Sequence, residues 1–451
     1  MSLGGSAVRR RAARGVAALL AGSLVAALPA LEATADPATA DKGKVAKPVE
    51  RTARFIAVQR SRVEIDLREE ASIRKVRVVT RLPRNMALRR GVLRGLAREG
   101  RTVIKVRGVS TLQGERGRRL RLKVVVVGRP QVAVKGTSLL TRGPGGRPGN
   151  ADSFGPVLSA DGSTVAFHSL ATNLLASPLE PQPGTWGRVF VWDRATGRTE
   201  LASVAPDGTP VPGGVMDISD DGSRVLIRSG SSLLLRDRRS ATTRELATDA
   251  QAVDLSGDCN LVTWSKDGRT TRVDLATGTS EDLGVGAFTA VSPNGRYLVA
   301  RDGETHSIWD TATGTTLRVL KTGRVEPWCT WSVEALTDDA ARATVEVGCD
   351  RSRGSSVIDT ASMTTLVSGS ILDATDAATW VAEANHRGAV WMAPVGGDSR
   401  VLSRQPATGG GSPSVAVSGE GDVVVWSVWG RNVVRDAYTT HSQVYIWTSG
   451  R

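Results

Sequence analysis

A short hairpin motif recurs along the C-terminal two thirds of the chain and constrains the fold more than any other feature. In its first copy, residues 157–169 (VLSADGSTVAFHS), two apolar segments flank Asp161 and Gly162. Asp-Gly between alternating apolar segments is a strong signal for two antiparallel strands joined by a tight turn. Further copies begin at Ser219, Ser256, Ser292, Leu336, Ala374 and Ser418. This part of the chain therefore contains seven similar β units, with starts 60, 37, 36, 44, 38 and 44 residues apart.

A second turn follows the hairpin in phase with it. The sequence D-x-A-T-G ends a β-rich run at Asp193, Asp274 and Asp310, with weaker versions at Asp237 and Asp359. Two turns per copy predict four antiparallel strands, and four strands in about 45 residues are typical of a β-propeller blade. We therefore predict an all-β fold with a seven-bladed β-propeller over residues 136–451, with six or eight blades as alternatives.

The last copy of the repeat stops after its third strand, at residues 444–447. Residues 137–146 parallel residues 199–208, and each of these segments leads into a hairpin copy. Residues 137–142 are therefore predicted to supply the outer strand of the last blade. Such a closure removes the two exposed sheet edges that an open array would leave.

The repeats resemble the TolB-like, WD40-like (PD40) β-propeller repeat family. The resemblance lies in the S-x-D-G hairpin, the Val-Ala-Phe strand at 165–167 and the segment Val-Phe-Val-Trp-Asp-x-x-Thr-Gly at 189–197. Trp-Asp at 192–193 and 309–310 is similar to WD40 repeats, but their Gly-His partner is missing, which favours the TolB-like family. The resemblance implies a recognition or scaffolding surface and names no activity.

The positive charge of the chain is concentrated before the propeller. Residues 42–135 hold 27 basic and 7 acidic residues, whereas residues 136–451 hold 28 basic and 35 acidic residues. Apolar residues such as Val63, Ile65, Leu120 and Leu122 alternate there with Arg or Lys, which predicts half-buried antiparallel strands with a cationic outer face. We predict a small basic β-sandwich over residues 51–135, similar in strand order to bacterial surface immunoglobulin-like repeats. Residues 87–97 could form a helical turn, although Gly91 and Gly95 disfavour it.

The basic domain is predicted to hold the protein on an anionic polymer of the cell envelope. Nucleic acid is not expected as a partner, because the chain has an export signal. A solvated cationic face without a dedicated ligand is the alternative. The candidate polyanion-binding residues are Arg74, Lys75, Arg77, Arg81, Arg89, Arg90, Arg116, Arg118, Arg119 and Arg121.

The first residues have the pattern of an export signal. Arg9, Arg10, Arg11 and Arg14 precede an apolar stretch over residues 15–28, and small residues at 33–35 and 38–40 offer cleavage sites. The stretch is short for a membrane span of about 20 residues, which disfavours a permanent anchor. We predict a signal peptide over 1–35 or 1–40, a flexible leader over 36–50 and no later membrane span. The mature protein is expected to be secreted or wall-associated, with Sec and twin-arginine export both open.

No catalytic, metal or cofactor site is expected. His168, His306, His386 and His441 belong to different repeats and lack ligand spacing, and no nucleophile elbow, Walker loop or zinc-spaced cysteine set is present. We therefore predict a non-catalytic recognition or scaffold protein. The alternative is a propeller hydrolase or lyase acting on an envelope polysaccharide. Three or more carboxylates or histidines at the propeller axis would favour that enzyme, and a small, apolar lining would favour binding.

Recognition of an envelope protein or glycan is predicted on two long loops, 171–188 and 429–442, which become adjacent when the ring closes. Trp186, Trp429, Tyr438 and His441 could form an aromatic platform there, although tryptophan beside a strand more often packs between blades. The oligomeric state stays open.

Cys329 and Cys349 are predicted to form a disulfide. If the hairpin of the fifth blade has the expected register, the two residues lie almost opposite each other, at a Cα separation of about 4.5–5.5 Å. That separation lies within disulfide range, and an exported protein meets an oxidising environment. Two buried free thiols are the alternative, and Cys259 has no predicted partner.

Overall fold

The computed structural model describes residues 47–450, except 130, 132, 182–186, 304, 322–328, 350–351, 370, 376–377, 386–387, 405, 407–413, 431–432, 435–438 and 440. The expected signal peptide and both cleavage sites lie outside the described residues. Within the described ranges the chain is almost entirely β-structure, with a single four-residue helix. A search of these ranges found no helix with the length and apolar character needed to cross a membrane.

Residues 49–129 form two sheets that enclose one core. The four-stranded sheet has the order β1-β7-β6-β3, and the three-stranded sheet has the order β2-β5-β4. Phe55, Ile65, Leu93 and Leu122 meet in the core between them, because alternate residues of each strand point to the same side. The elements are β1 (Val49–Val58), β2 (Arg62–Asp66), α1 (Leu67–Glu70), β3 (Ile73–Val78), β4 (Met86–Arg89), β5 (Val92–Leu96), β6 (Gly100–Ser110) and β7 (Arg119–Arg129).

Three details of this domain differ from the sequence-based expectations. Strand β1 begins at Val49, inside the segment expected to be a flexible leader. It pairs with β7 in parallel, with Ala53 opposite Val124, whereas only antiparallel pairing was expected. The helical turn considered for 87–97 is wrong, because β4 and β5 pair there and Gly91 occupies the turn with a φ of +86°. Leu93 is buried by this hairpin, so the period of two prevails over helix propensity.

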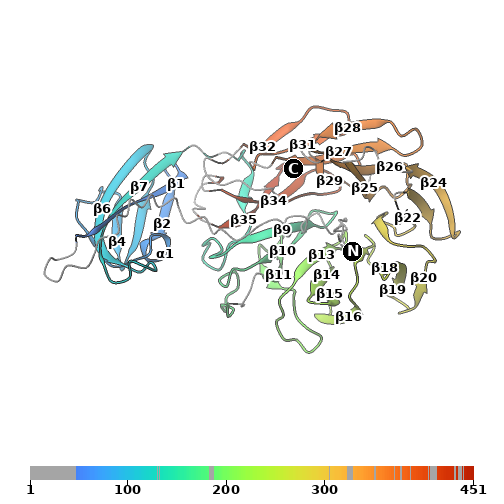
Figure 1. The fold of residues 1–451 in the computed structure, drawn as a ribbon, viewed down its shortest axis with the longest axis horizontal. Coiled ribbons are helices and arrows are strands. Elements are labelled where there is room, and N and C mark those ends of the chain that lie inside the picture. Colours follow the sequence, from blue (N-terminus) through green and yellow to red (C-terminus); the bar gives the residue numbers. More distant parts are fainter. Residues whose placement is uncertain are drawn as a thin grey trace.

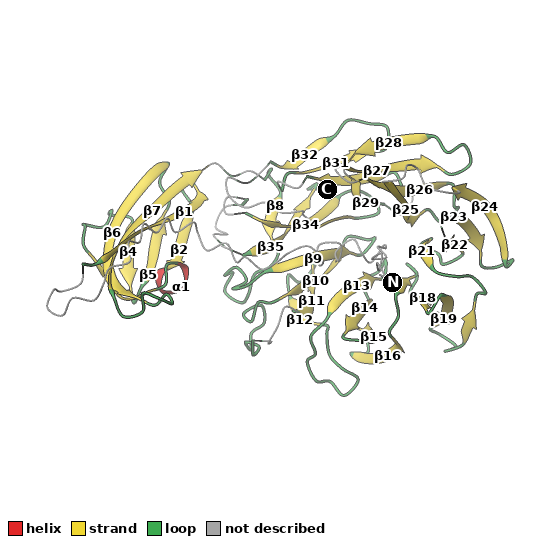
Figure 2. Cartoon of the chain, viewed as in Figure 1, coloured by secondary structure: helices red, strands yellow, loops and turns green. Residues whose placement is uncertain are grey.

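Seven further sheets, counted over the described part of the chain, contain four antiparallel strands each. Figure 2 shows how completely strands and turns account for this region. In six of the sheets the strands follow chain order, and the seventh combines the last three strands with β8. The strands are β8 (Thr137–Leu139), β9 (Ser153–Leu158), β10 (Thr164–Ser169), β11 (Arg188–Asp193), β12 (Thr199–Leu201), β13 (Gly214–Ile218), β14 (Arg224–Ser229), β15 (Ser232–Asp237), β16 (Thr242–Thr248), β17 (Ala252–Leu255), β18 (Leu261–Lys266), β19 (Arg269–Asp274), β20 (Ser280–Asp282), β21 (Phe288–Val291), β22 (Tyr297–Asp302), β23 (Thr305–Asp310), β24 (Thr315–Lys321), β25 (Cys329–Leu336), β26 (Arg342–Cys349), β27 (Ser352–Asp359), β28 (Thr365–Gly369), β29 (Ile371–Ala374), β30 (Trp380–Ala384), β31 (Val390–Pro394), β32 (Arg400–Ser403), β33 (Ser414–Val417), β34 (Val423–Trp429) and β35 (Ser442–Thr448).

The seven sheets follow one another around a closed ring (Figure 1). The first strand of each sheet contacts a strand of the next one: β9 contacts β13, and the contacts continue through β17, β21 and β25. The fifth and sixth sheets meet through β27 and β29, and β33 touches both β29 and β9. Strands near this centre are buried, whereas the outer strand β20 is fully exposed.

Strand β8 closes the ring by joining the two ends of this region. It pairs antiparallel with β35, with Leu139 opposite Tyr445 and Thr137 opposite Trp447. The pairing agrees with the outer strand that the repeat alignment predicts, although the ladder covers three residues and not all of 137–142. One backbone bond extends it, from the Leu140 N–H to the Val444 oxygen at 2.9 Å.

The recurring turn is stabilised by its own serine and aspartate. The Ser159 hydroxyl donates to Asp161 Oδ1 at 2.5 Å and accepts from the Thr164 N–H at 3.0 Å. Gly162 has a φ of +68°, which favours glycine. Adjacent turns are also linked around the ring: Gly419 N–H donates to the Ala160 oxygen, and Asp220 N–H to the Gly257 oxygen, at 2.8 and 2.9 Å. The hairpin motif therefore builds both the sheets and the inner edge of the ring.

Candidate functional site

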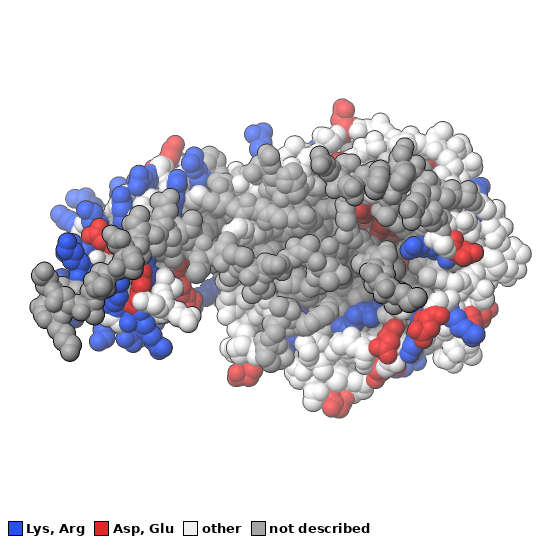
Figure 3. Space-filling model, in the orientation of Figure 1, with Lys and Arg blue, Asp and Glu red and all other residues white. Residues whose placement is uncertain are grey.

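The outward side of the sheet β1-β7-β6-β3 is the most strongly charged surface of the N-terminal domain. We call it the cationic sheet face. Ile104 and Leu122 point into the core, so their neighbours Lys105 and Arg121 point outward and are exposed. Among the outward positions of these four fully described strands, Glu50 is the one carboxylate. The cations are Arg54, Arg74, Arg77, Arg101, Lys105, Arg107, Arg119, Arg121, Lys123 and Arg129. Figure 3 shows Lys and Arg gathered on this domain, at the left of the view, and sparser on the ring.

Strand register places like charges directly opposite one another on this face. Arg107 lies opposite Arg121 on β7 and opposite Arg77 on β3. Lys105 lies opposite Lys123 one row further along. Opposed Cβ atoms in antiparallel strands are about 4.5–5.5 Å apart, and like charges there destabilise the sheet. In water, two unit charges at about 5 Å repel by about 1 kcal/mol, so an anion bound between them would relieve a real repulsion.

Several carboxylates of the domain contact cations, and the contact of Glu50 lies on the cationic sheet face. Glu50 Oε1 lies 3.6 Å from Arg121 Nη1, but the two side chains are 75% and 68% exposed, and such a pair contributes little. Glu115 contacts Arg51, which is buried on the core side of β1. Glu64 accepts from Arg94 at 2.6 Å on the outer side of the other sheet, and this contact lowers the pKa of Glu64.

The ten predicted polyanion-binding residues are all exposed, but the structure divides them among several places. Arg74, Arg77, Arg119 and Arg121 lie on the cationic sheet face, and Lys75 lies at an irregularity in β3, with a φ of +53°. Of the rest, Arg81 follows β3, Arg89 and Arg90 lie at the β4–β5 turn, and Arg116 and Arg118 lie between β6 and β7. Sequence reasoning did not select Lys105, Arg107 and Lys123, although their alternation with apolar residues was the signal for them.

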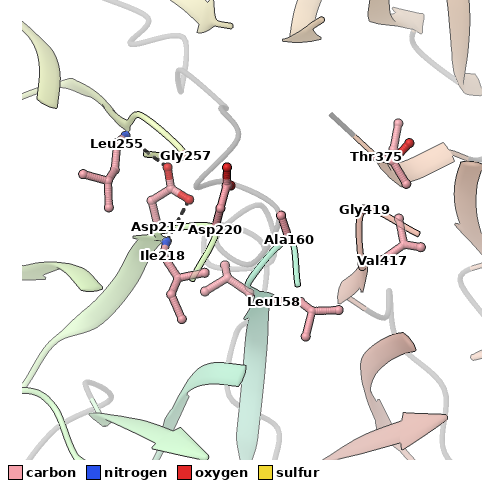
Figure 4. Close-up of a pocket in the computed structure, with 12 residues that line it drawn as sticks. Leu158, Ala160, Asp217, Ile218, Asp220, Leu255, Gly257, Thr375, Val417 and Gly419 are labelled. Carbon is pink, nitrogen blue, oxygen red and sulfur yellow. Dashed lines mark hydrogen bonds between the residues drawn. The ribbon is translucent and has the colours of Figure 1, made fainter. Parts of the chain in front are cut away.

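A small pocket, open to solvent, lies where the first strands of several sheets end (Figure 4). Its lining is mainly small or apolar and includes Leu158, Ala160, Ile218, Gly257, Val417 and Gly419. Two carboxylates, those of Asp217 and Asp220, belong to the described lining.

The buried aspartates of the first strands tie neighbouring sheets together. Asp217 Oδ2 accepts from the Leu255 N–H at 3.1 Å, in the next sheet, and Oδ1 accepts from the Ile218 N–H at 2.9 Å. Asp373 repeats this contact at the equivalent place, where Oδ2 accepts from the Val417 N–H at 2.8 Å. Within the residues that the structure describes, no group of three or more His, Cys, Asp or Glu is arranged to hold a metal ion.

The predicted aromatic platform can be followed only in part, because Trp186 and Tyr438 lie outside the described residues. Trp429 ends β34 opposite Ser442, so His441 lies next to it at the same end of the hairpin. His441 Nδ1 is 3.7 Å from Asp152 Oδ1, and the Ser442 N–H donates to that oxygen at 2.7 Å. Asp152 directly precedes β9, so the first and last sheets meet at these loops.

His168, by contrast, belongs to the interior of a sheet. It is 4% exposed, neither ring nitrogen has a hydrogen-bond partner, and its ring meets that of Phe154 edge to face at 4.1 Å. Burial lowers the pKa of His168 to about 3, so the ring is neutral near pH 7. The side chain therefore serves packing, at a cost in stability under acidic conditions.

The fifth sheet brings the two predicted disulfide cysteines into register. Cys329 on β25 lies directly opposite Cys349 on β26, in the register expected for the hairpin of the fifth blade. The disulfide itself stays a prediction. Cys259 is a buried free cysteine in the described structure.

No protein-family model matches the chain, and no curated protein matches it. Three solved structures share a distant likeness. Hydrazine synthase of Kuenenia stuttgartiensis is 15% identical, with a TM-score of 0.41 over 61% of this chain and 91% of that one. An oligogalacturonate lyase in complex with manganese is 11% identical, with a TM-score of 0.45 over 78% and 98%. A chain of the mitotic checkpoint complex is 12% identical, with a TM-score of 0.44 over 71% and 96%. The closed ring of four-stranded sheets defines the chain as an all-β protein with a β-propeller-like fold.

Proposed function

We propose that this protein is an exported, non-catalytic recognition or scaffold protein of the cell envelope. It consists of a seven-bladed TolB-like propeller preceded by a basic, immunoglobulin-like β-sandwich. The sandwich holds anionic envelope polymers, and the propeller binds an envelope protein or glycan through its loops. The observation that carries the proposal is the row of Arg77, Arg107 and Arg121 directly opposite one another on an exposed face.

A dedicated ligand explains this row better than a merely solvated surface does. A face with interspersed charges of both signs would keep the protein as soluble as a face of cations alone, and it would avoid repulsion between neighbouring strands. Here the cations occupy matching positions on three adjacent strands, and the one carboxylate of the face lies at the end of the row. A polyanion that covers the row would relieve the repulsion between these opposed cations.

The propeller axis supports binding over catalysis. Both oxygens of Asp217 accept backbone N–H groups, so the carboxylate is committed to holding adjacent blades together. A general acid or base needs an oxygen within reach of a substrate proton, and Asp217 is 8% exposed with each oxygen engaged by a backbone N–H.

Fractionation of cells that produce the full chain tests the proposal. The mature protein should begin after Ala35 or Ala40, sediment with the envelope and leave it in a high-salt wash, because surface charges are screened within about 8 Å at physiological salt. Crosslinking before the wash should capture a partner bound to the propeller. The double variant Trp429→Ala/His441→Ala should capture less of this partner than the parent does. An uncleaved cytosolic protein would contradict the export step. Release of new reducing ends or unsaturated products from envelope polysaccharides would favour a hydrolase or lyase.

A further inference from the structure

We infer that the ligand of the cationic sheet face is a linear phosphate-bearing polymer, a polyol phosphate or a polyphosphate, lying along β6 and β7. The inference rests on the proposed function and deepens it, because it names the chemical class of the anion and its path. Three observations lead to it: the alignment of the cations, the absence of exposed rings from the domain and the type of cation at the centre.

The cations form two parallel rows along adjacent strands. Arg119, Arg121 and Lys123 occupy successive outward positions of β7, and Arg107 and Lys105 face the last two across the ladder. Successive outward residues of a strand are about 6.6–6.8 Å apart, and neighbouring strands are about 4.8 Å apart. A chain with one charge on each short repeat can therefore meet a cation at every step along the track. We call these five residues the β6–β7 track.

The described domain offers no ring for stacking. Phe55 is the single aromatic residue among residues 47–129, and its side chain is fully buried. Proteins that bind single-stranded nucleic acid combine a basic groove with aromatic side chains on which the bases stack. An acidic glycan can also meet a basic patch through its charges, but the described domain has no exposed ring on which a pyranose could stack. The track provides charge alone, which suits a ligand that consists of phosphates on a flexible chain.

Arginine at the centre of the track fits phosphate. The guanidinium group presents a planar fork of N–H donors that matches phosphate oxygens in a bidentate way. Arg107 and Arg121 stand directly opposite each other, so two forks can bind one phosphate group from both sides. An anionic lipid surface would meet the same forks, but it would not require cations in line along one pair of strands.

Binding of defined polymers to the purified mature protein tests the inference. The probes are long-chain polyphosphate, polygalacturonate of equal charge, and vesicles of phosphatidylglycerol with phosphatidylcholine. The track variant is Arg107→Gln/Arg121→Gln/Lys123→Gln. The matched control, Arg62→Gln/Arg84→Gln/Arg94→Gln, removes the same charge from exposed positions on or just before the strands of the other sheet of the domain.

The expected result is polyphosphate binding at least tenfold tighter than polygalacturonate binding. Five contacts predict a slope of about −3.5 for log K against log salt, falling to about −1.4 in the track variant, with about 100-fold weaker binding at 0.1 M salt. The control variant should keep a slope close to that of the parent.

Three outcomes would overturn the inference alone, and a fourth would also reject the proposed function. Equal affinity for both polymers would leave an anion-binding face without phosphate preference, so the proposed function would survive alone. Equal losses of affinity in both variants would mean that the polymer is held by the net charge of the domain and not by the β6–β7 track. Vesicle binding without polymer binding would assign the face to a membrane surface. Binding of none of the probes, together with no binding to isolated envelope, would reject the proposed function itself.

Discussion

Replacing Gln443 by leucine should weaken the closure of the ring. Gln443 lies fully buried in β35 and joins the last strand to the segment that follows β8. Its Oε1 accepts from the Thr141 hydroxyl at 2.6 Å, and its Nε2 donates to the oxygens of Gly149 and Ala151 at 3.2 and 3.1 Å. Leucine has a similar size but neither donates nor accepts, so all three partners lose a hydrogen bond inside the protein.

The expected destabilisation follows from these three bonds. A typical hydrogen bond contributes about 1 kcal/mol net, so the three together contribute about 3 kcal/mol. With a urea m-value of about 3 kcal/mol/M, the unfolding midpoint should fall by about 1 M. Tryptophan fluorescence is the right probe, because all 11 tryptophans lie at or after Trp186 and none lies in the basic domain.

Two further variants make this prediction refutable. Thr316→Val, at an exposed position on β24 elsewhere in the ring, should change stability by less than about 0.5 kcal/mol. Thr141→Val should weaken the ring as well, and its effect should not add fully to that of Gln443→Leu, because the two side chains share one bond. An unchanged midpoint in Gln443→Leu, or an equal shift in Thr316→Val, would refute this account of the closure.

Three other predictions concern single residues of the ring. Burial lowers the pKa of His168 to about 3, so below about pH 6.5 the unfolded chain binds a proton that the folded protein does not bind. The free energy of unfolding should therefore fall between pH 7 and pH 5, by about 2 kcal/mol more in the parent than in His168→Gln. Urea titration at each pH measures this difference. If Cys329 and Cys349 form a disulfide, dithiothreitol should lower the unfolding midpoint of the parent by the equivalent of about 3 kcal/mol. It should leave the midpoint of Cys329→Ser/Cys349→Ser unchanged. Mass mapping that finds both thiols free in the parent would reject the disulfide. Asp217→Ala leaves the N–H groups of Ile218 and Leu255 without their acceptor and should cost about 2–4 kcal/mol, and a neutral effect would contradict its role between adjacent sheets.

The four-stranded sheets were predictable because their turns are built locally. Ser159, Asp161 and Gly162 stabilise their hairpin within a few residues, so the motif alone specifies it. The short helix α1 was not predicted, since Leu67 continues the alternation of the preceding strand. Only the structure shows that Asp66 caps the next turn, accepting from the Arg68 N–H at 2.9 Å.

The candidate site was predictable as a face but not as a set of contacts. Alternation of apolar and basic residues determines which side chains point outward from a strand. It does not determine which strands are neighbours, so the opposition of Arg107 to both Arg77 and Arg121 depends on pairing between distant segments. The tie from Asp217 to Leu255 is also non-local, because it joins the first strands of two consecutive sheets, 38 residues apart.

Cosedimentation of the purified mature protein with isolated cell envelope, over a series of salt concentrations, tests the central claim most directly. We predict binding at low salt that weakens steeply as salt rises and is largely lost in Arg107→Gln/Arg121→Gln/Lys123→Gln, while Arg62→Gln/Arg84→Gln/Arg94→Gln retains it. No binding of the parent at low salt, or equal binding by the two variants, would contradict the assignment of the cationic sheet face as the surface that holds this protein at the envelope.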